Sequence, residues 1–275
     1  MGDGKMLTHA PQTDSGRRVD AVRHRPAARQ LTVIPRFFCP PPLASGEDFA
    51  LPPGVAHHAV RVLRLKEGDA LLLFDGEGGE YPARLARVDG REVLADVGEH
   101  RSVERESPLS VTLVQGLAAA ERMEFAIQKS VELGVAAIVP VTTARSVVRL
   151  PAERARRRVE HWQQVVVAAC EQCGRDRLPA VHAPRDLSEW LRTPSTAASR
   201  LLLSPDAPRS LGQLGRPEGT IELLIGPEGG LTADESAAAI ATGFLAVRLG
   251  PRTLRTETAA PAALAAMNAL WGDWR

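Results

Sequence analysis

Polar residues crowd one short stretch near the C-terminus of the sequence. The stretch follows Gly250 and Pro251, and its polar members include Arg252, Arg255, Thr256, Glu257 and Thr258. Capping the start of a helix would use only one or two of them. An arginine can stabilise negative charge that develops on a bound molecule, and a nearby glutamate can accept a proton or orient the arginine. The stretch therefore predicts a binding or catalytic site.

A second candidate is Glu228, which stands alone among the glycines of residues 226–230. A single carboxylate there has little packing purpose, so we expect it to reach a polar or positive part of a ligand. Structural alternatives stay open for all three side chains. Glu228 could be a solvated loop charge, Arg255 a helix-start arginine paired with a carboxylate, and Glu257 a first-turn charge that the helix dipole favours.

Each stretch lies between a predicted strand and a predicted helix. Residues 220–225 form an apolar run typical of a buried parallel strand, and the helix after Thr232 begins with a capping box that includes Glu235. Residues 244–249 predict a second strand, and the alanine-rich residues 256–271 predict a helix. Ligands of open α/β sheets bind beyond the carboxyl ends of the strands, where glycines let them approach the backbone. Both loops are therefore expected to face a ligand.

Together the two loops closely resemble the C-terminal signature of the ribosomal RNA small subunit methyltransferase E family, within the SPOUT class of RNA methyltransferases. The matching motifs are GPEGGLT at 226–232, GF at 243–244 and LGPRTLRTETA at 249–259. The resemblance implies an α/β SPOUT-type parallel sheet with a deep trefoil knot that holds S-adenosylmethionine. It also implies a homodimer and N3 methylation of one uridine in the decoding region of 16S rRNA, without a metal.

The resemblance also implies roles for single residues. Main-chain groups and apolar walls of the knot should hold the methyl donor, through Leu203, Ser204, Gly226, Glu228, Gly229, Leu249, Gly250 and Leu254. Arg255 is expected to be the cation beside O2 or O4 of the uracil, and Glu257 the base or the partner that orients Arg255. Thr253 stands where the family usually has isoleucine.

Two other functions stay open. One is a SPOUT methyltransferase that acts on another RNA, and the other is a non-catalytic RNA-binding factor in ribosome assembly. The intact glycine loops argue against the second, because a binding-only protein needs no donor pocket. A Rossmann-type nucleotide binder fits poorly, because no GxGxxG motif follows the first strand of the α/β region.

The chain divides into three predicted parts. Residues 1–34 are polar and are expected to be a disordered extension. Residues 35–104 predict a small PUA-like β-barrel that binds RNA, with strands at 70–74, 80–87 and 92–97 and a helix at 54–63. The charged residues 99–107 read as a linker. Residues 108–275 predict the SPOUT domain.

Alternating strands and helices in this last part are typical of a parallel sheet. The strands are expected at 110–116, 136–141, 180–183, 200–204, 222–225 and 246–249. Before the last two loops, helices are expected at 120–133 and 151–173.

Candidate RNA contacts are spread over both domains. They are Arg36, His58, Arg61 and Arg64 in the small domain and Arg122, Lys129, Gln172 and Arg175 in the larger one. A window from Arg145 to Arg158, with Arg149, Arg154, Arg156 and Arg157, is the best local basic patch. It could contact phosphates or be a solvated helix surface, and the same alternative holds for Arg122 and Lys129.

Composition limits the remaining classes. The net charge of +1 over 275 residues places any RNA site in a local patch. Three cysteines make no disulfide framework, and the Cys170–Cys173 pair reads as two small residues on a helix instead of a metal site. No apolar stretch reaches membrane-spanning length, so a cytoplasmic protein is expected.

Overall fold

The computed structural model describes residues 34–90, 92–147 and 151–274. The expected disordered extension and Arg149 lie outside these ranges, except for Ile34, which is exposed.

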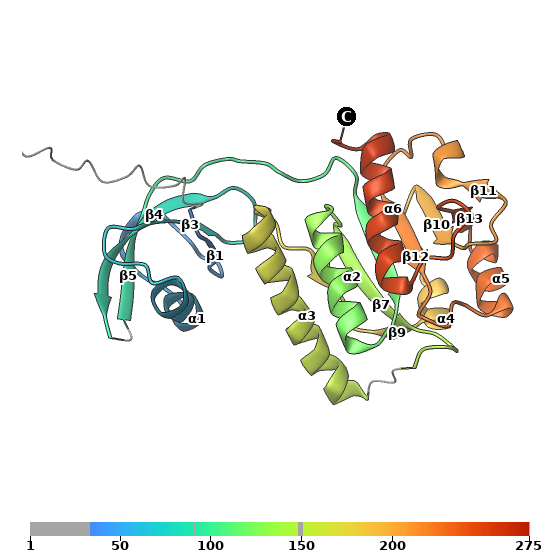
Figure 1. Cartoon of the computed structure of the whole chain (residues 1–275), viewed down its shortest axis with the longest axis horizontal. Helices are drawn as coiled ribbons and strands as arrows, with labels where there is room; N and C mark the ends of the chain where they lie inside the picture. The colour runs from blue at the N-terminus through green and yellow to red at the C-terminus, as the bar shows by residue number, and fades with distance from the viewer. Residues whose placement is uncertain (1–33, 91, 148–150, 275) are drawn as a thin grey trace, which may run out of the picture. The chain divides into compact units, whose positions relative to one another are not determined.

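The first part of the described chain is a five-stranded sheet with the order β1-β3-β4-β5-β2 (Figure 1). Its strands are β1 (Arg36–Phe38), β2 (Gly46–Ala50), β3 (Ala70–Phe74), β4 (Tyr81–Asp89) and β5 (Glu92–Val97). Between β2 and β3 lie α1 (Pro53–His57) and a π-helical turn (His58–Val62). Alternate residues of the strands, such as Leu71, Leu73 and Leu85, are buried against Phe37 and Ala59. The predicted strands and the predicted helix are confirmed here, whereas the short β1 and β2 were not predicted.

The rest of the chain forms an eight-stranded sheet with the order β11-β13-β10-β12-β6-β7-β8, in which β9 also pairs with β7. Its strands are β6 (Val111–Gly116), β7 (Ala137–Thr142), β8 (Ala180–Val181), β9 (Arg185–Asp186), β10 (Ser199–Leu203), β11 (Arg209–Ser210), β12 (Ile221–Ile225) and β13 (Leu245–Arg248). All of its pairings are parallel, as the alternation of strands and helices predicts.

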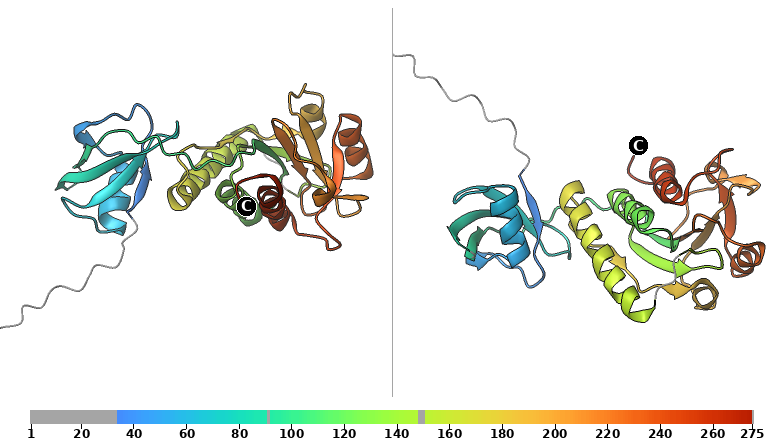
Figure 2. Two further views of the ribbon diagram at one scale, coloured as in Figure 1. Left: turned by 90° about the horizontal axis from the view of Figure 1, so that it is seen from above. Right: turned by 60° about the horizontal axis from the view of Figure 1, so that its bottom comes forward.

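Helices cover both faces of this sheet, as Figure 2 shows. They are α2 (Ala120–Glu132), α3 (Ala152–Cys173), α4 (Leu187–Leu191), α5 (Ala233–Ala241) and α6 (Thr256–Trp271). Successive strand residues point to opposite faces. Leu113 of β6 therefore packs in the core under α2, α3 and α6, whereas the next residue, Val114, packs in the core under α4 and α5.

The helix at 256–271 and the capping box of Thr232 and Glu235 are confirmed. The short α4 was not predicted, although Asp186 caps it by accepting hydrogen bonds from the backbone N–H groups of Ser188 and Glu189. Residues 99–107 connect the two sheets, as expected of a linker. Arg101 forms a backbone β-bridge with Glu80, and Glu106 forms an ion pair with Arg175. No helix within the described ranges has the length and apolar character needed to cross a membrane.

Candidate functional site

A cavity of about 680 Å³ lies at the carboxyl ends of β10, β12 and β13. Its walls are the loop of residues 226–231, the segment 249–257 and residues 202–206. All eight residues expected to hold a methyl donor line it: Leu203, Ser204, Gly226, Glu228, Gly229, Leu249, Gly250 and Leu254. Arg255 and Glu257 line the same cavity. The structure therefore brings both sequence motifs to one site.

Close packing fixes the first loop. A Cβ atom on Gly116, at the end of β6, would lie 2.5 Å from the backbone nitrogen of Pro227, and one on Gly226 would lie 3.0 Å from that of Leu231. Gly230 has a φ of +68°, which favours glycine. Gly226 is thus required because a side chain would clash, and Gly230 because of its backbone conformation.

The second loop ends where α6 begins. Gly250 has a φ of +94°, and Arg255 is the N-cap residue of α6 but caps it with its backbone alone. The Arg255 side chain is exposed and has no hydrogen-bond or ion-pair partner in the part of the chain that the structure describes. The alternative of an arginine paired with a neighbouring carboxylate is therefore wrong, and the guanidinium is free to meet a ligand.

A buried hydrogen-bond chain ties the two loops together. Gln115 Nε2 donates to Thr256 Oγ1 at 2.9 Å, and Thr256 Oγ1 donates to the carbonyl oxygen of Gly226 at 2.7 Å. Gln115 is 1% exposed and Thr256 is 6% exposed. Sequence reasoning missed Gln115, although a glutamine at the end of an apolar strand is a signal that could have identified it.

Arg122 of α2 reaches the cavity and contacts both carboxylates. Its Nη1 donates to Oε1 of Glu228 at 2.9 Å, and its Nε lies 3.9 Å from Oε1 of Glu257. The backbone N–H of Ala119 also donates to Oε1 of Glu228 at 2.9 Å. Glu228 is thus a paired carboxylate and not a solvated loop charge.

Burial and hydrogen bonds act in opposite directions on the pKa of Glu228. Burial by itself would raise the pKa of Glu228, but the hydrogen bonds from Ala119 and Arg122 outweigh it and hold the pKa below its ordinary value. The second oxygen of Glu228 and that of Glu257 are both buried, and neither has a hydrogen-bond partner among the described residues. Buried oxygens of this kind require donors, which a ligand can provide.

Arg145 supports the first loop from outside. Its Nη1 donates to the carbonyl oxygen of Gly229 at 2.9 Å, and the neighbouring backbone N–H of Ala144 donates to Oε1 of Glu235 at 2.7 Å. The other described arginines of the basic window lie on α3 and include pairs with exposed glutamates, such as Arg157 with Glu153. Arg145 therefore contacts the cavity loop instead of extending a patch on that helix.

The candidate RNA contacts do not form one group. His58 and Arg61 are exposed on the π-helical turn, and Arg64, also exposed, follows it with a φ of +56°. Lys129 pairs with Glu132 at 2.7 Å, and Gln172 is exposed on α3. None of these residues lines the cavity.

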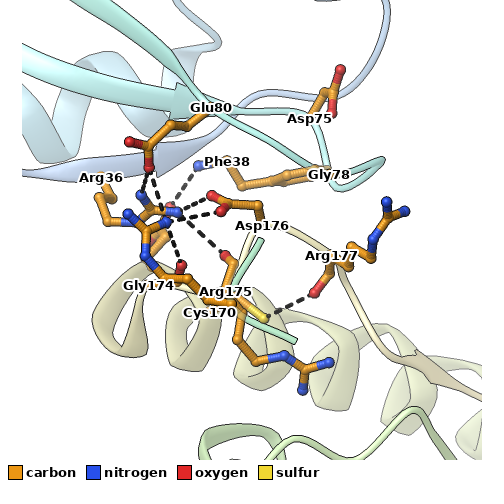
Figure 3. Close-up of polar contacts among 12 residues, drawn as sticks. Arg36, Phe38, Asp75, Gly78, Glu80, Cys170, Gly174, Arg175, Asp176 and Arg177 are labelled. Atoms are coloured by element: carbon orange, nitrogen blue, oxygen red, sulfur yellow. Dashed lines mark hydrogen bonds and ion pairs between the residues drawn. The ribbon is translucent and has the colours of Figure 1, made fainter. Parts of the chain in front are cut away.

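Two of the candidate arginines form ion pairs with other residues of the chain. Arg36 pairs with Glu80 and Asp176 (Figure 3). Arg175 is 5% exposed, pairs with Glu106 and donates to the carbonyl oxygens of Val131 and Val135. In this arrangement neither guanidinium is presented to an RNA.

Among the described residues, no group of three or more His, Cys, Asp or Glu residues could hold a metal ion. Burial raises the pKa of Cys170 to about 12, and Cys173 lies on the same helix without a cysteine partner. Cys170 and Cys173 are therefore free thiols and do not form a disulfide with any described residue.

Both the small sheet and the larger α/β part of the chain match known protein families. Residues 105–268 match the family model of the RNA methyltransferase domain, and residues 51–98 match that of the RNA methyltransferase PUA domain. The chain is 31% identical to ribosomal RNA small subunit methyltransferase E of Buchnera aphidicola, over 87% of this chain and 98% of that protein. It is 32% identical to the Bacillus subtilis enzyme of the same name, over 77% of this chain and 86% of that one.

Solved structures agree with this result. A ribosomal RNA small subunit methyltransferase E from Neisseria gonorrhoeae, bound to S-adenosylmethionine, is 41% identical with a TM-score of 0.82, over 88% of this chain and 100% of that one. A methyltransferase from Legionella pneumophila, also in complex with S-adenosylmethionine, is 36% identical with a TM-score of 0.84, over 88% and 99%.

Proposed function

Because the chain belongs to the ribosomal RNA small subunit methyltransferase E family, we propose that it methylates N3 of one uridine in 16S rRNA with S-adenosylmethionine as donor. The observation that carries the proposal is the single cavity that gathers both glycine loops, Arg255 and Glu257. The relatives' printed name supports the small-subunit rRNA as the substrate.

The residues of the cavity fit the donor. Its volume of about 680 Å³ lies in the range of small-molecule sites. Leu203, Leu249 and Leu254 offer apolar surface to the adenine, and the loop backbones offer hydrogen bonds to its edge. The donor carries a sulfonium and an ammonium group, and Glu228, whose second oxygen has no partner among the described residues, can receive positive charge. When bound, S-adenosylmethionine supplies an electrophilic methyl group.

The acceptor requires different help. Uracil N3 carries a proton at neutral pH, and its lone pair becomes available to the methyl carbon only as that proton leaves. The free guanidinium of Arg255 can stabilise the negative charge that spreads to O2 and O4 of the uracil. Glu257 can accept the proton or orient the base. As N3 bonds to the methyl carbon, the carbon–sulfur bond breaks and its electron pair stays on sulfur, so the reaction balances without a metal.

In this proposal the two parts of the chain have separate roles. Residues 35–104 dock the RNA, with the exposed His58, Arg61 and Arg64 as phosphate or base contacts, and residues 108–275 bind the donor and transfer the methyl group. Lys129 and Gln172 remain proposed RNA contacts of the larger domain. Because the chain is neutral overall, the RNA should be held by such local groups and by its folded shape.

We also propose the knot and the homodimer of the SPOUT class for this chain. Thr256 of α6 is bonded to the backbone of the first loop, which supports the close passage of the two segments that a knot requires. Sedimentation velocity at micromolar concentration tests the dimer, and a monomer would contradict it.

The proposed function is tested by methyl transfer. Small subunits from a strain that lacks the enzyme are incubated with labelled S-adenosylmethionine and either the wild-type protein or Arg255→Ala. We expect the wild type to label the rRNA, and the variant to bind the donor but to transfer almost no label. Donor binding without transfer to any rRNA would move the assignment to another RNA target, and absence of donor binding would favour an assembly factor.

A further inference from the structure

Four charged side chains meet where the small sheet contacts the end of α3, and we call them the junction cluster: Arg36, Glu80, Arg105 and Asp176. Figure 3 labels three of them, Arg36, Glu80 and Asp176. Arg36 pairs with both acids, whose side chains are 6% and 2% exposed. Arg105 Nη1 lies 3.1 Å from Glu80 Oε2 and 2.9 Å from Asp176 Oδ2. Each acid therefore faces two arginines.

The four residues come from different parts of the chain. Arg36 begins β1 and Glu80 precedes β4, both in the small sheet. Arg105 lies in the segment between the two sheets, and Asp176 follows α3. The cluster thus joins the small sheet, the connecting segment and the larger α/β unit at one point.

Its charges are balanced and mostly shielded from water. Burial by itself would raise the pKa of Glu80, but hydrogen bonds from Arg105 and Arg36 outweigh it and lower that pKa, whereas for Asp176 burial outweighs the arginines and raises the pKa. Removing one partner of a buried ion pair leaves an uncompensated charge, whereas the intact pair adds little net stability. Such a cluster consequently favours one geometry of its surroundings over others.

Neighbouring contacts restrict the same junction. The backbone N–H of Phe38 donates to Oε1 of Glu171 on α3 at 3.0 Å. Arg177 Nη1 donates to the carbonyl oxygen of Glu77 at 2.6 Å, and a Cβ on Gly78 would lie 2.6 Å from Nη2 of Arg177. Phe74 of the small sheet is fully buried in the core of the larger one. The small sheet is therefore held by polar and apolar contacts together.

We propose that the junction cluster positions the small sheet relative to the donor cavity, so that an RNA docked on the small sheet presents its acceptor base to that cavity. Arg36 and Asp176 act in this as positioning residues, and none of the four residues lines the cavity. The inference rests on the proposed function, because it assigns the small sheet to the RNA and the cavity to the methyl donor.

The test compares variants of the full chain. Asp176→Asn keeps the shape of the side chain and removes its charge, whereas Arg105→Gln removes the charge and shortens the side chain, at a residue whose side chain is 40% exposed. Glu92→Gln is the matched control, because Glu92 and Arg87 form an exposed ion pair on the same sheet. For small-subunit rRNA we expect kcat/KM to fall about tenfold in Asp176→Asn, less in Arg105→Gln, and not in the control, with the Kd for S-adenosylmethionine unchanged in all three.

A second readout does not depend on methyl transfer. Trypsin can cut after Arg101 in the segment between the sheets, and cleavage of a folded protein reports local opening. We expect faster cleavage at Arg101 in Asp176→Asn than in the wild type and in Glu92→Gln.

The outcomes separate the two proposals. If the wild type is active and Asp176→Asn matches it in kcat/KM and in cleavage rate, the positioning role is overturned. A parallel loss of donor affinity in Asp176→Asn would overturn it too, because the cluster would then stabilise the whole chain without selective effect on the RNA. If the wild type transfers no methyl group to rRNA, the proposed function fails, and the trypsin comparison still decides whether the cluster holds the junction.

Discussion

Arg122 Nη1 lies 2.9 Å from Oε1 of Glu228, although the two residues are 106 positions apart in the sequence. The contact joins α2 to the loop that lines the cavity, and the same arginine lies near Glu257. A helix outside both signature motifs thus contacts both acids of the candidate donor site.

Replacing this arginine should weaken donor binding. In Arg122→Met the Glu228 carboxylate loses the hydrogen bond from the guanidinium, so we expect the Kd for S-adenosylmethionine to rise about tenfold, equivalent to about 1.4 kcal/mol. Arg122→Lys should recover part of the affinity because it restores the charge. Isothermal titration measures both variants. Arg156→Met, at a side chain that is 74% exposed, is the control, and an equal rise there would contradict the prediction.

The lowered pKa of Glu228 predicts a specific dependence on pH. A carboxylate whose pKa is lower in the folded than in the unfolded state stabilises the fold above the unfolded value, and this contribution is lost as the pH falls through the folded value. The difference in unfolding free energy between the wild type and Glu228→Gln should stay constant from neutral pH down to about 5 and shrink below about 4.3. Urea unfolding at several pH values measures it. A difference that changes between pH 6 and 8 would argue against this titration.

Gly116 should not tolerate a side chain. In Gly116→Ala the new Cβ meets the backbone of Pro227 at 2.5 Å, and a backbone cannot move aside as the end of a flexible side chain can. We expect a loss of about 1–3 kcal/mol in stability, as overpacking typically causes. Thermal unfolding tests this, with Gly212→Ala as the control because nothing lies within 4 Å of its added Cβ. Equal melting temperatures for the two variants would refute the steric account.

Thr256 should matter through its hydroxyl group. Thr256→Val preserves the shape but leaves Gln115 Nε2 with only the carbonyl oxygen of Gly116 as acceptor, and it leaves the carbonyl of Gly226 without its donor. Unpaired buried polar groups cost about 1–3 kcal/mol, so the variant should unfold at lower urea and bind the donor less tightly. Thr196→Val, at an exposed position, should behave as the wild type in both measurements. If the two variants behave alike, the hydrogen-bond chain does not hold the loops.

Features formed by residues close together in the sequence could be predicted, whereas contacts between distant residues could not. The capping box of Thr232 and Glu235 spans three residues, and α6 follows from local composition, so both were predicted with their boundaries. Strand ends with glycine loops at one edge of a parallel sheet predicted that both loops face a ligand, whereas the individual residues of the cavity were implied by the family resemblance. The pairing of Arg36 with Asp176 spans 140 positions, and no local pattern distinguishes it from an arginine that faces RNA.

Residue type also limited the prediction. Arg175 was a candidate RNA contact, but its guanidinium lies buried against Glu106 and two carbonyl groups. Arginine has five donors that suit buried carbonyls as well as phosphates, so its presence alone does not tell the two apart. Gln115 was hidden for the opposite reason, because it lies in a strand that reads as apolar core.

The most direct test of the account is the identity of the nucleoside that the protein modifies. Small-subunit rRNA from a strain lacking the enzyme is treated with the protein and S-adenosylmethionine, digested to nucleosides and examined by mass spectrometry against methyluridine standards. The account predicts one N3-methyluridine per rRNA, absent with Arg255→Ala. A methyl group on another nucleoside, or at a uridine carbon, would contradict it.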